Sequence, residues 1–113
     1  MNVYDQAHGL AQAIKASEEY KQYDMVRQQV KANAEIDAMI KDFQAKQFEM
    51  QAKQMTGQQM TQEDVESIQQ LYGIMLKDPL SAHYVEAEMR FSLMMKDVYE
   101  ILGEATGMGD ILG

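Results

Sequence analysis

Cysteine and tryptophan are absent from the sequence, and proline occurs once among the 113 residues. Without cysteine, the chain can form no disulfide, thiolate zinc site, iron–sulfur cluster or cysteine nucleophile. The apolar runs are only a few residues long, as in Ile74-Met75-Leu76, whereas a membrane-spanning helix needs about 20 such residues. The first residues also lack the continuous apolar segment of a secretory signal. We therefore expect a soluble protein of the cytoplasm.

Basic side chains are scarce. Ten Lys and Arg stand against 18 Asp and Glu, which leaves a formal net charge of −8. Binding to nucleic acid usually needs a basic face, and here the basic residues are dispersed among Glu and Gln. Pairs such as Asp37–Lys41 and Asp42–Lys46 are typical of solvated helix surfaces. We expect no direct nucleic-acid partner and no membrane partner, and RNA binding is the weakest of the functional hypotheses.

Catalytic patterns are also missing. No serine lies in a Gly-x-Ser-x-Gly elbow, and no glycine-rich loop leads into Lys-Ser or Lys-Thr to hold a phosphate. Acid–base catalysis needs a tuned group in a pocket, and the chain has only two histidines. The sequence therefore predicts a protein that is not an enzyme and that holds no cofactor.

Two short motifs leave a metal site open as an alternative. Asp5 precedes His8 by three residues, and His83 precedes Glu86 by the same spacing. Helical bundles with carboxylate-bridged metal pairs use Glu-x-x-His on two helices and a glutamate from each of two others. Here the two motifs run in opposite order, and His8 lies off the apolar stripe of its segment. A solvated surface is the preferred interpretation, and a helical-bundle protein that binds a metal or small ligand is the alternative.

Helix-start signals divide the chain into segments. Residues with good N-cap side chains precede apolar residues at helical spacing: Asn2, Ser17, Asn33, Thr61 and Asp78. Around Ser17 the pattern allows either a break or one kinked helix. Asp64 would complete a capping box with Thr61, and Pro79 suits a first helical position, where no amide hydrogen is needed. No segment alternates in the manner of a strand. We predict an all-α helical bundle of four to five helices with no sheet.

Two of the predicted helices are long. One runs from about Ala34 to Met55 and would end at Gly57, and the last runs from roughly Pro79 to Gly103. We expect these two helices to pack against each other, antiparallel, within a single helical domain spanning 1–113. The glycine-rich tail, about 104–113, is expected to be flexible. The side chains expected in the core or between subunits are Phe43, Phe48, Met50, Tyr84, Phe91 and Met94.

Methionine is unusually frequent, with eleven residues. Most of them fit core stripes, where flexible thioether side chains fill gaps. Others, among them Met25, Met55 and Met89, do not all share one face with the core residues. They suggest an apolar surface that a second subunit or another protein would bury. We expect a homodimer or a higher homo-oligomer, and a further protein partner is an open alternative.

Several stretches of the chain, taken in order, are similar to one family. They are Asn2-Val-Tyr-Asp-Gln-Ala-His-Gly-Leu-Ala-Gln-Ala-Ile14, Ser17-Glu-Glu-Tyr20, the segment from Asn33 to Ile40, Asp42-Phe-Gln-Ala-Lys-Gln-Phe-Glu49 and Glu86-Ala-Glu-Met-Arg-Phe-Ser92. With them the chain resembles YheA-type proteins of the YlbF/YmcA family of Gram-positive bacteria. The resemblance implies long antiparallel helices, association into dimers or higher oligomers, and a regulatory role without catalysis. It also implies a link to competence, sporulation, biofilm formation and the control of mRNA processing.

The sequence departs from the family pattern at two points. Some members carry C-terminal cysteines associated with iron–sulfur clusters, and this chain has no cysteine. Asn33 is followed by Ala34 where the family pattern has Asn-Pro, so the N-cap is kept and the rigid first position is lost. The resemblance transfers no catalytic residue. Together these observations predict a cytoplasmic adaptor or regulator that acts through self-association and protein–protein contacts.

Overall fold

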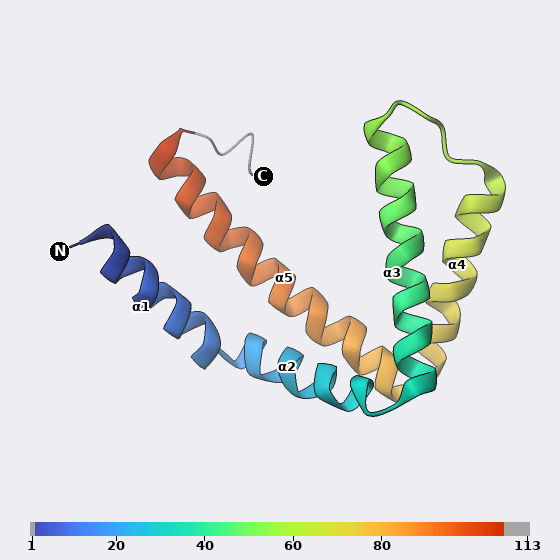
Figure 1. The fold of residues 1–113 in the computed structure, drawn as a ribbon, viewed down its shortest axis with the longest axis horizontal. Coiled ribbons are helices and arrows are strands. Elements are labelled where there is room, and N and C mark those ends of the chain that lie inside the picture. Colours follow the sequence, from blue (N-terminus) through green and yellow to red (C-terminus); the bar gives the residue numbers. More distant parts are fainter. Residues whose placement is uncertain (1, 108–113) are drawn as a thin grey trace. The chain divides into compact units, whose positions relative to one another are not determined.

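The computed structural model describes residues 2–107, which form five α-helices and, within that range, no strand. The helices are α1 (Val3–Ala16), α2 (Glu18–Lys31), α3 (Ala34–Met55), α4 (Gln62–Lys77) and α5 (Pro79–Thr106) (Figure 1). The predicted all-α fold is therefore confirmed. No helix in the described part of the chain is both long and apolar enough to cross a membrane.

The first two helix starts follow the predicted caps. The side chain of Asn2 accepts a hydrogen bond from the Tyr4 amide at 2.7 Å. Ser17 has an extended backbone, with ψ of 151°, and this ends α1 and breaks the helix. Its hydroxyl donates to the Ile14 carbonyl at 2.6 Å and accepts from the Tyr20 amide at 3.1 Å. One residue thus closes α1 and caps α2, because its side chain serves both helix ends.

Both ends of α3 are also formed by hydrogen bonds between residues close in the sequence. Asn33 caps the start, accepting from the Ile36 amide at 3.2 Å. At the other end Gly57 takes a φ of +80°, which glycine adopts without strain. The Gln58 amide then donates to the Lys53 carbonyl at 2.9 Å and the Gly57 amide to the Gln54 carbonyl at 3.3 Å. These two bonds form a Schellman motif, so the predicted stop at Gly57 is confirmed.

The last two helices begin as predicted and the final one ends later. Thr61 and Asp64 form the capping box of α4 with two 3.1 Å bonds. Asp78 accepts from the Leu80 amide at 2.9 Å, and Pro79 is the first residue of α5. The helix runs on to Thr106 instead of ending near Gly103, because Glu104 and Ala105 are good helix formers.

Gly107, with a φ of +71°, follows the last turn of α5. The flexibility of the predicted tail, about 104–113, stays a prediction, and its residues 104–106 are helical. Its remainder, 108–113, lies outside the described residues.

The chain divides into two compact units that share α2 and α5. We call residues 27–85 the hairpin unit and residues 2–26 with 86–107 the terminal unit. The prediction of a single domain spanning 1–113 stays a prediction.

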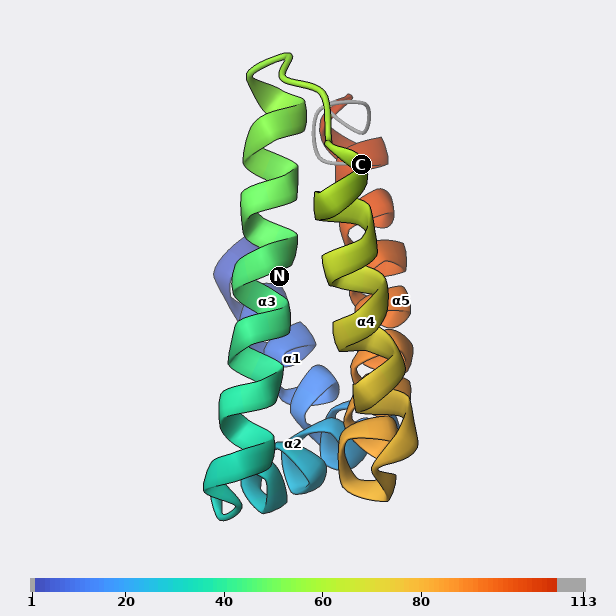
Figure 2. The ribbon, with the colours of Figure 1, turned by 90° about the vertical axis from the view of Figure 1, so that its right-hand side faces the viewer.

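In the hairpin unit, α3 and α4 run antiparallel and side by side (Figure 2). The buried apolar side chains of this unit are Val30, Ile36, Ile40, Met75, Tyr84 and Val85. The prediction that the last helix packs against α3 needs correction here. The helix packed along α3 is α4, because residues 56–61 reverse the chain directly between them. The first turns of α5 meet α3 where the Gln44 amide donates to the Tyr84 hydroxyl at 3.0 Å.

The turn from α4 into α5 is held by a buried serine. Ser81 is fully buried, and its hydroxyl donates to the Met75 carbonyl. Its amide also points to the Asp78 carboxylate, 3.4 Å away. Burial of a hydroxyl is costly unless it is hydrogen-bonded. The bond to Met75 satisfies Ser81 and also occupies a carbonyl left free at the end of α4.

Candidate interaction surface

The first helix carries an apolar stripe that the chain covers only in part, since two of its four residues are half-buried and two are exposed. Val3, Ala7, Leu10 and Ile14 follow at spacings of four, three and four, which places them on one side of α1. We call these four residues the α1 face. No residue of α1 is buried, and Val3 is 81% exposed. An amphipathic helix is normally stabilised by burying such a stripe.

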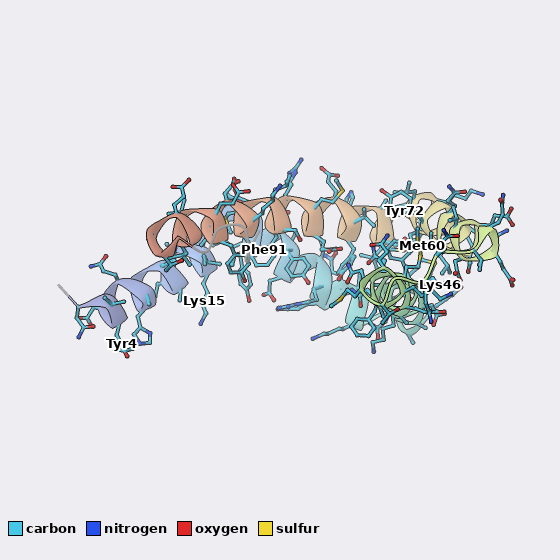
Figure 3. The ribbon with its side chains drawn as sticks, turned by 90° about the horizontal axis from the view of Figure 1, so that it is seen from above. Tyr4, Lys15, Lys46, Met60, Tyr72 and Phe91 are labelled. Atoms are coloured by element: carbon cyan, nitrogen blue, oxygen red, sulfur yellow. The ribbon has the colours of Figure 1, made fainter. Side chains whose placement is uncertain are left out.

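Charged side chains avoid the α1 face. At about 100° per residue, Asp5 and His8 point to the opposite side of α1, and Lys15 lies more than a quarter turn from the centre of the face. Tyr4 is exposed and lies on the same side of the helix as Lys15, since three turns separate them (Figure 3). It borders the α1 face with an aromatic ring, and Lys15 lies on the same border near the other end of α1.

An aromatic cluster packs α2 against α5 inside the terminal unit. The ring of Phe91 stacks on Tyr23, with centroids 5.1 Å apart and planes 5° apart, and it meets Tyr20 at 5.7 Å and 59°. All three side chains are half-buried. Such pairs contribute roughly 0.5–1.5 kcal/mol each beyond the area they bury. The cluster therefore holds the two helices together in a unit whose α1 contributes no buried side chain.

Beyond Phe91 the apolar side of α5 becomes exposed. Met94 and Val98 continue the stripe as half-buried residues. Tyr99, Ile101 and Leu102 extend it toward the end of the helix, and all three are exposed. We call these last three residues the α5 end. The charged residues of the same stretch occupy the other side of the helix: Lys96, Asp97, Glu100 and Glu104.

A charge cluster closes the hairpin unit. Asp64 is buried, with 6% of its surface exposed. Its carboxylate accepts hydrogen bonds from Lys46 Nζ at 3.0 Å and from Lys53 Nζ at 2.6 Å. The hydrogen bonds from Lys53, Lys46 and the Thr61 amide hold the pKa of Asp64 well below its usual range. The same carboxylate raises the pKa of Lys46. The cluster joins α3 to the first turn of α4, and its role is structural.

The sequence predicts only part of this cluster. The pattern indicates a capping box for Asp64 and a pair between Lys46 and Asp42 on the same helix. The structure instead pairs Lys46 with Asp64 of the next helix. The available signal was the spacing of Lys46 and Lys53, seven residues or two turns apart on one side of α3. The other predicted pair, Asp37–Lys41, is present at 2.9 Å.

The six predicted core or interface residues lie in different surroundings. Phe43 is half-buried, with its ring 5.8 Å from that of Tyr72, and Tyr84 is buried. Met50, Phe91 and Met94 are half-buried. Phe48 is 73% exposed on the outer side of α3, seven residues before Met55, which is 88% exposed. A place for Phe48 between subunits stays a prediction.

The residues of the metal alternative do not gather into a site. Asp5, His8 and His83 are exposed, and Glu86 pairs with Arg90 at 2.7 Å. Across residues 2–107, no three His, Asp or Glu side chains come close enough to hold a metal ion. No observed geometry favours the alternative, and metal analysis of untagged protein tests it directly.

These features define a class. The protein is all-helical, with one compact hairpin and one unit that leaves apolar helix sides exposed. The profile of one family, described as "Control of competence regulator ComK, YlbF/YmcA", matches residues 3–106. The chain belongs to this YlbF/YmcA family, as its resemblance to the family indicated.

Individual relatives agree with this assignment. A UPF0342 protein of Symbiobacterium thermophilum is 40% identical over 103 residues, covering 91% of this chain and 92% of the relative. One of Caldicellulosiruptor saccharolyticus is 36% identical over 109 residues, covering 96% and 91%. A solved structure of a DUF964 protein of unknown function from Bacillus stearothermophilus has the same fold. Its TM-score is 0.80 at 22% identity, with 93% of this chain and 92% of that chain covered.

Proposed function

We propose that this protein is a non-enzymatic adaptor or regulator that acts through self-association and contacts with other proteins. The observation that carries the proposal is the α1 face, an apolar stripe on a helix without a single buried residue. A contiguous exposed apolar patch marks a site of protein association, whereas single apolar residues scattered over a surface are ordinary. The α5 end adds a second uncovered apolar stretch in the same unit.

The family description supports a regulatory role. It refers to control of the competence regulator ComK, and regulation of this kind works through binding. The charged residues named here fit a role without catalysis, because they form ion pairs on helix surfaces and one cluster with a structural role. Arg90 pairs with Glu86 and Lys41 with Asp37 on helix surfaces, while Asp64 holds the hairpin together. We carry over to this chain the control of competence and of mRNA processing only as the setting in which such an adaptor would act.

Light scattering at micromolar concentration tests self-association. We expect a mass that is a multiple of 12.9 kDa, and a clean monomer would contradict this half of the proposal. Capture from a lysate of the source organism tests the adaptor role, with the bound proteins identified by mass spectrometry. A protein that binds reproducibly in stoichiometric amounts supports an adaptor, and repeated absence of any such protein counts against it.

A matched pair of variants gives the capture experiment its control. Ala7→Glu adds a negative charge to the α1 face, and Gln12→Glu adds the same charge to the opposite side of α1. Both positions are exposed, so neither change disturbs a buried side chain. A partner that depends on the face is lost with Ala7→Glu and kept with Gln12→Glu. Loss with both variants would indicate a response to net charge alone.

A further inference from the structure

We infer that the end of the hairpin unit where α3 connects to α4 is a site of methionine oxidation. There Met55 and Met60 form sulfoxides, and Gln54 binds the sulfoxide oxygen of Met60. We call residues 54–61 the hairpin tip. The inference goes beyond the proposed adaptor role and does not depend on self-association. It identifies a covalent modification, its oxidant, which is hydrogen peroxide, and the side chain that binds the oxidised group.

Thioethers are the only sulfur groups of this protein, because the sequence has eleven methionines and no cysteine. Peroxide therefore meets no thiol that would react first. In the reaction, the methionine sulfur attacks one oxygen of hydrogen peroxide, so that an S–O bond forms and the O–O bond breaks. The sulfur loses two electrons and the peroxide is reduced. The second oxygen takes up the proton of the first and leaves as water.

The methionines of the hairpin tip are open to peroxide in water. Met55, the last residue of α3, is 88% exposed, and Met60, two residues before α4, is also exposed. Met75, in the core of the same unit, is 1% exposed, so its sulfur can react only when the hairpin opens. Oxidation of Met75 would bury a polar group, which is costly. Oxidation at the hairpin tip leaves the sulfoxides in water and the hairpin folded.

A side-chain amide lies next to one of these two sulfurs. Gln54 Nε2 is 4.0 Å from Met60 Sδ, which is the distance of a weak N–H···S hydrogen bond. A thioether is a weak acceptor, whereas oxidation makes the side chain polar. The oxygen of a sulfoxide is the better acceptor because its S–O bond is strongly polarised. Oxidation of Met60 thus converts a weak contact between the end of α3 and the connection to α4 into an ordinary hydrogen bond.

Nearby hydrogen bonds fix the backbone on both sides of this contact. The Gln54 carbonyl accepts from the Gly57 amide at 3.3 Å, in the Schellman motif that ends α3. Met60 directly precedes Thr61, which forms the capping box with Asp64 through two bonds of 3.1 Å. Gln54 and Met60 are therefore held near each other before oxidation. The new bond needs only rotation of the two side chains, so that little further ordering opposes it.

Two exposed methionines of the terminal unit provide an internal comparison. Met25 of α2 and Met89 of α5 are both more exposed than Met60. Exposure alone therefore predicts that peroxide oxidises them as well. The inference assigns the binding of the new oxygen by Gln54 to the sulfoxide of Met60 alone, and this assignment distinguishes the hairpin tip from other exposed thioethers.

The rate of oxidation at each methionine tests the first part of the inference. The full chain is treated with hydrogen peroxide for increasing times, and tandem mass spectrometry locates each added oxygen. We expect Met55 and Met60 to be oxidised at least about tenfold faster than Met75, with the far-UV circular dichroism of the helices unchanged. Oxidation of Met75 at the same rate would overturn the inference. Loss of the helical signal in step with oxidation of the hairpin tip would overturn it too.

Nuclear magnetic resonance of the side-chain amides tests the part assigned to Gln54. In the oxidised wild type, we expect an amide proton of the Gln54 side chain to move downfield, because it donates to a stronger acceptor. Oxidised Met60→Leu should lack this shift. Oxidised Met89→Leu, the matched control at an exposed helix position, should keep it. An unmoved Gln54 signal in the oxidised wild type, or a shift that persists in Met60→Leu, would overturn the inference.

Discussion

In the hairpin unit, α3 and α4 reverse direction across residues 56–61, and their apolar sides meet inside the chain. In the terminal unit, Ser17 alone separates α1 from α2. A single extended residue is too short for the reversal that antiparallel neighbours need. The α1 face therefore cannot fold back onto α2. The length of the connection, more than the strength of the apolar pattern, decides whether the apolar side of a helix can pack against the next helix of the same chain.

The stability of the two units should respond differently to loss of a side chain. Met75 is 1% exposed in the hairpin unit, so Met75→Ala leaves a cavity and should cost about 2–5 kcal/mol of unfolding free energy. Met55→Ala removes a side chain that is 88% exposed, and its effect should stay within about 0.5 kcal/mol. Urea denaturation followed by circular dichroism measures both. Equal losses of stability would show that Met75 does not lie in the core of the hairpin unit.

The charge cluster of the hairpin unit is the next largest contribution. Asp64→Asn leaves Lys46 and Lys53 without their shared carboxylate and removes one arm of the capping box. We expect a melting temperature lower by roughly 5–10 °C. Asp42→Asn, at an exposed position of α3, is the matched control and should change it little.

The cluster also predicts a pH dependence. Because the pKa of Asp64 is lowered from its ordinary value of 3.8 in the folded protein, its contribution is fully present above that value. The contribution is lost as the pH falls below about 4. Thermal melts between pH 7 and pH 3 should show this loss in the wild type and a smaller one in Asp64→Asn. An identical pH profile for the two proteins would contradict the cluster.

The terminal unit should depend on its aromatic cluster. Phe91→Leu keeps an apolar side chain and removes the ring contacts to Tyr20 and Tyr23. We expect a loss of about 1–2 kcal/mol. The near-ultraviolet circular dichroism signal of the tyrosines should also weaken. Leu93→Ala, at an exposed position of the same helix, serves as the control, and a loss as large as that of Phe91→Leu would argue against the cluster.

Replacing one glycine of the hairpin unit should increase the stability of the protein. Gly73 lies inside α4, and a Cβ added there would meet no atom within 4 Å. Gly73→Ala should therefore stabilise the protein by about 0.5–1 kcal/mol, because alanine loses less backbone entropy in a helix. Gly57→Ala, at a φ of +80°, should have the opposite sign. The two melting temperatures, measured side by side, test this contrast.

The smallest expected effect concerns a carboxylate of the terminal unit. Burial raises the pKa of Glu88 above its ordinary value of 4.5, so its charged form disfavours folding at neutral pH. Its contribution to stability improves as the pH falls through the raised pKa, which is the opposite of the sign at Asp64. Glu88→Gln should raise the melting temperature by about 1–2 °C at pH 7 and have no effect near pH 4. A gain that is equal at both pH values would contradict this assignment.

Helix ends were predictable because they depend on residues three or four positions apart. Ser17, Asn33 and Thr61 make the capping bonds that their positions indicated, and Pro79 begins its helix. The sequence predicts an end of α5 near Gly103, whereas the helix continues to Thr106 and Gly107 takes the positive φ. A glycine alone does not distinguish a helix interior from a helix end.

The helix-end signals do not predict which helices pack against each other. The apolar stripes of α1, α3 and α5 look alike as patterns, yet α3 is covered by α4, while α1 has no buried residue. Likewise, nothing near Lys46 in the sequence pointed to Asp64, 18 residues away. Caps and turns are short-range interactions, so the local sequence determines them. Coverage of a helix side and pairing of charges between helices depend on chain reversal and packing, which only the tertiary structure decides.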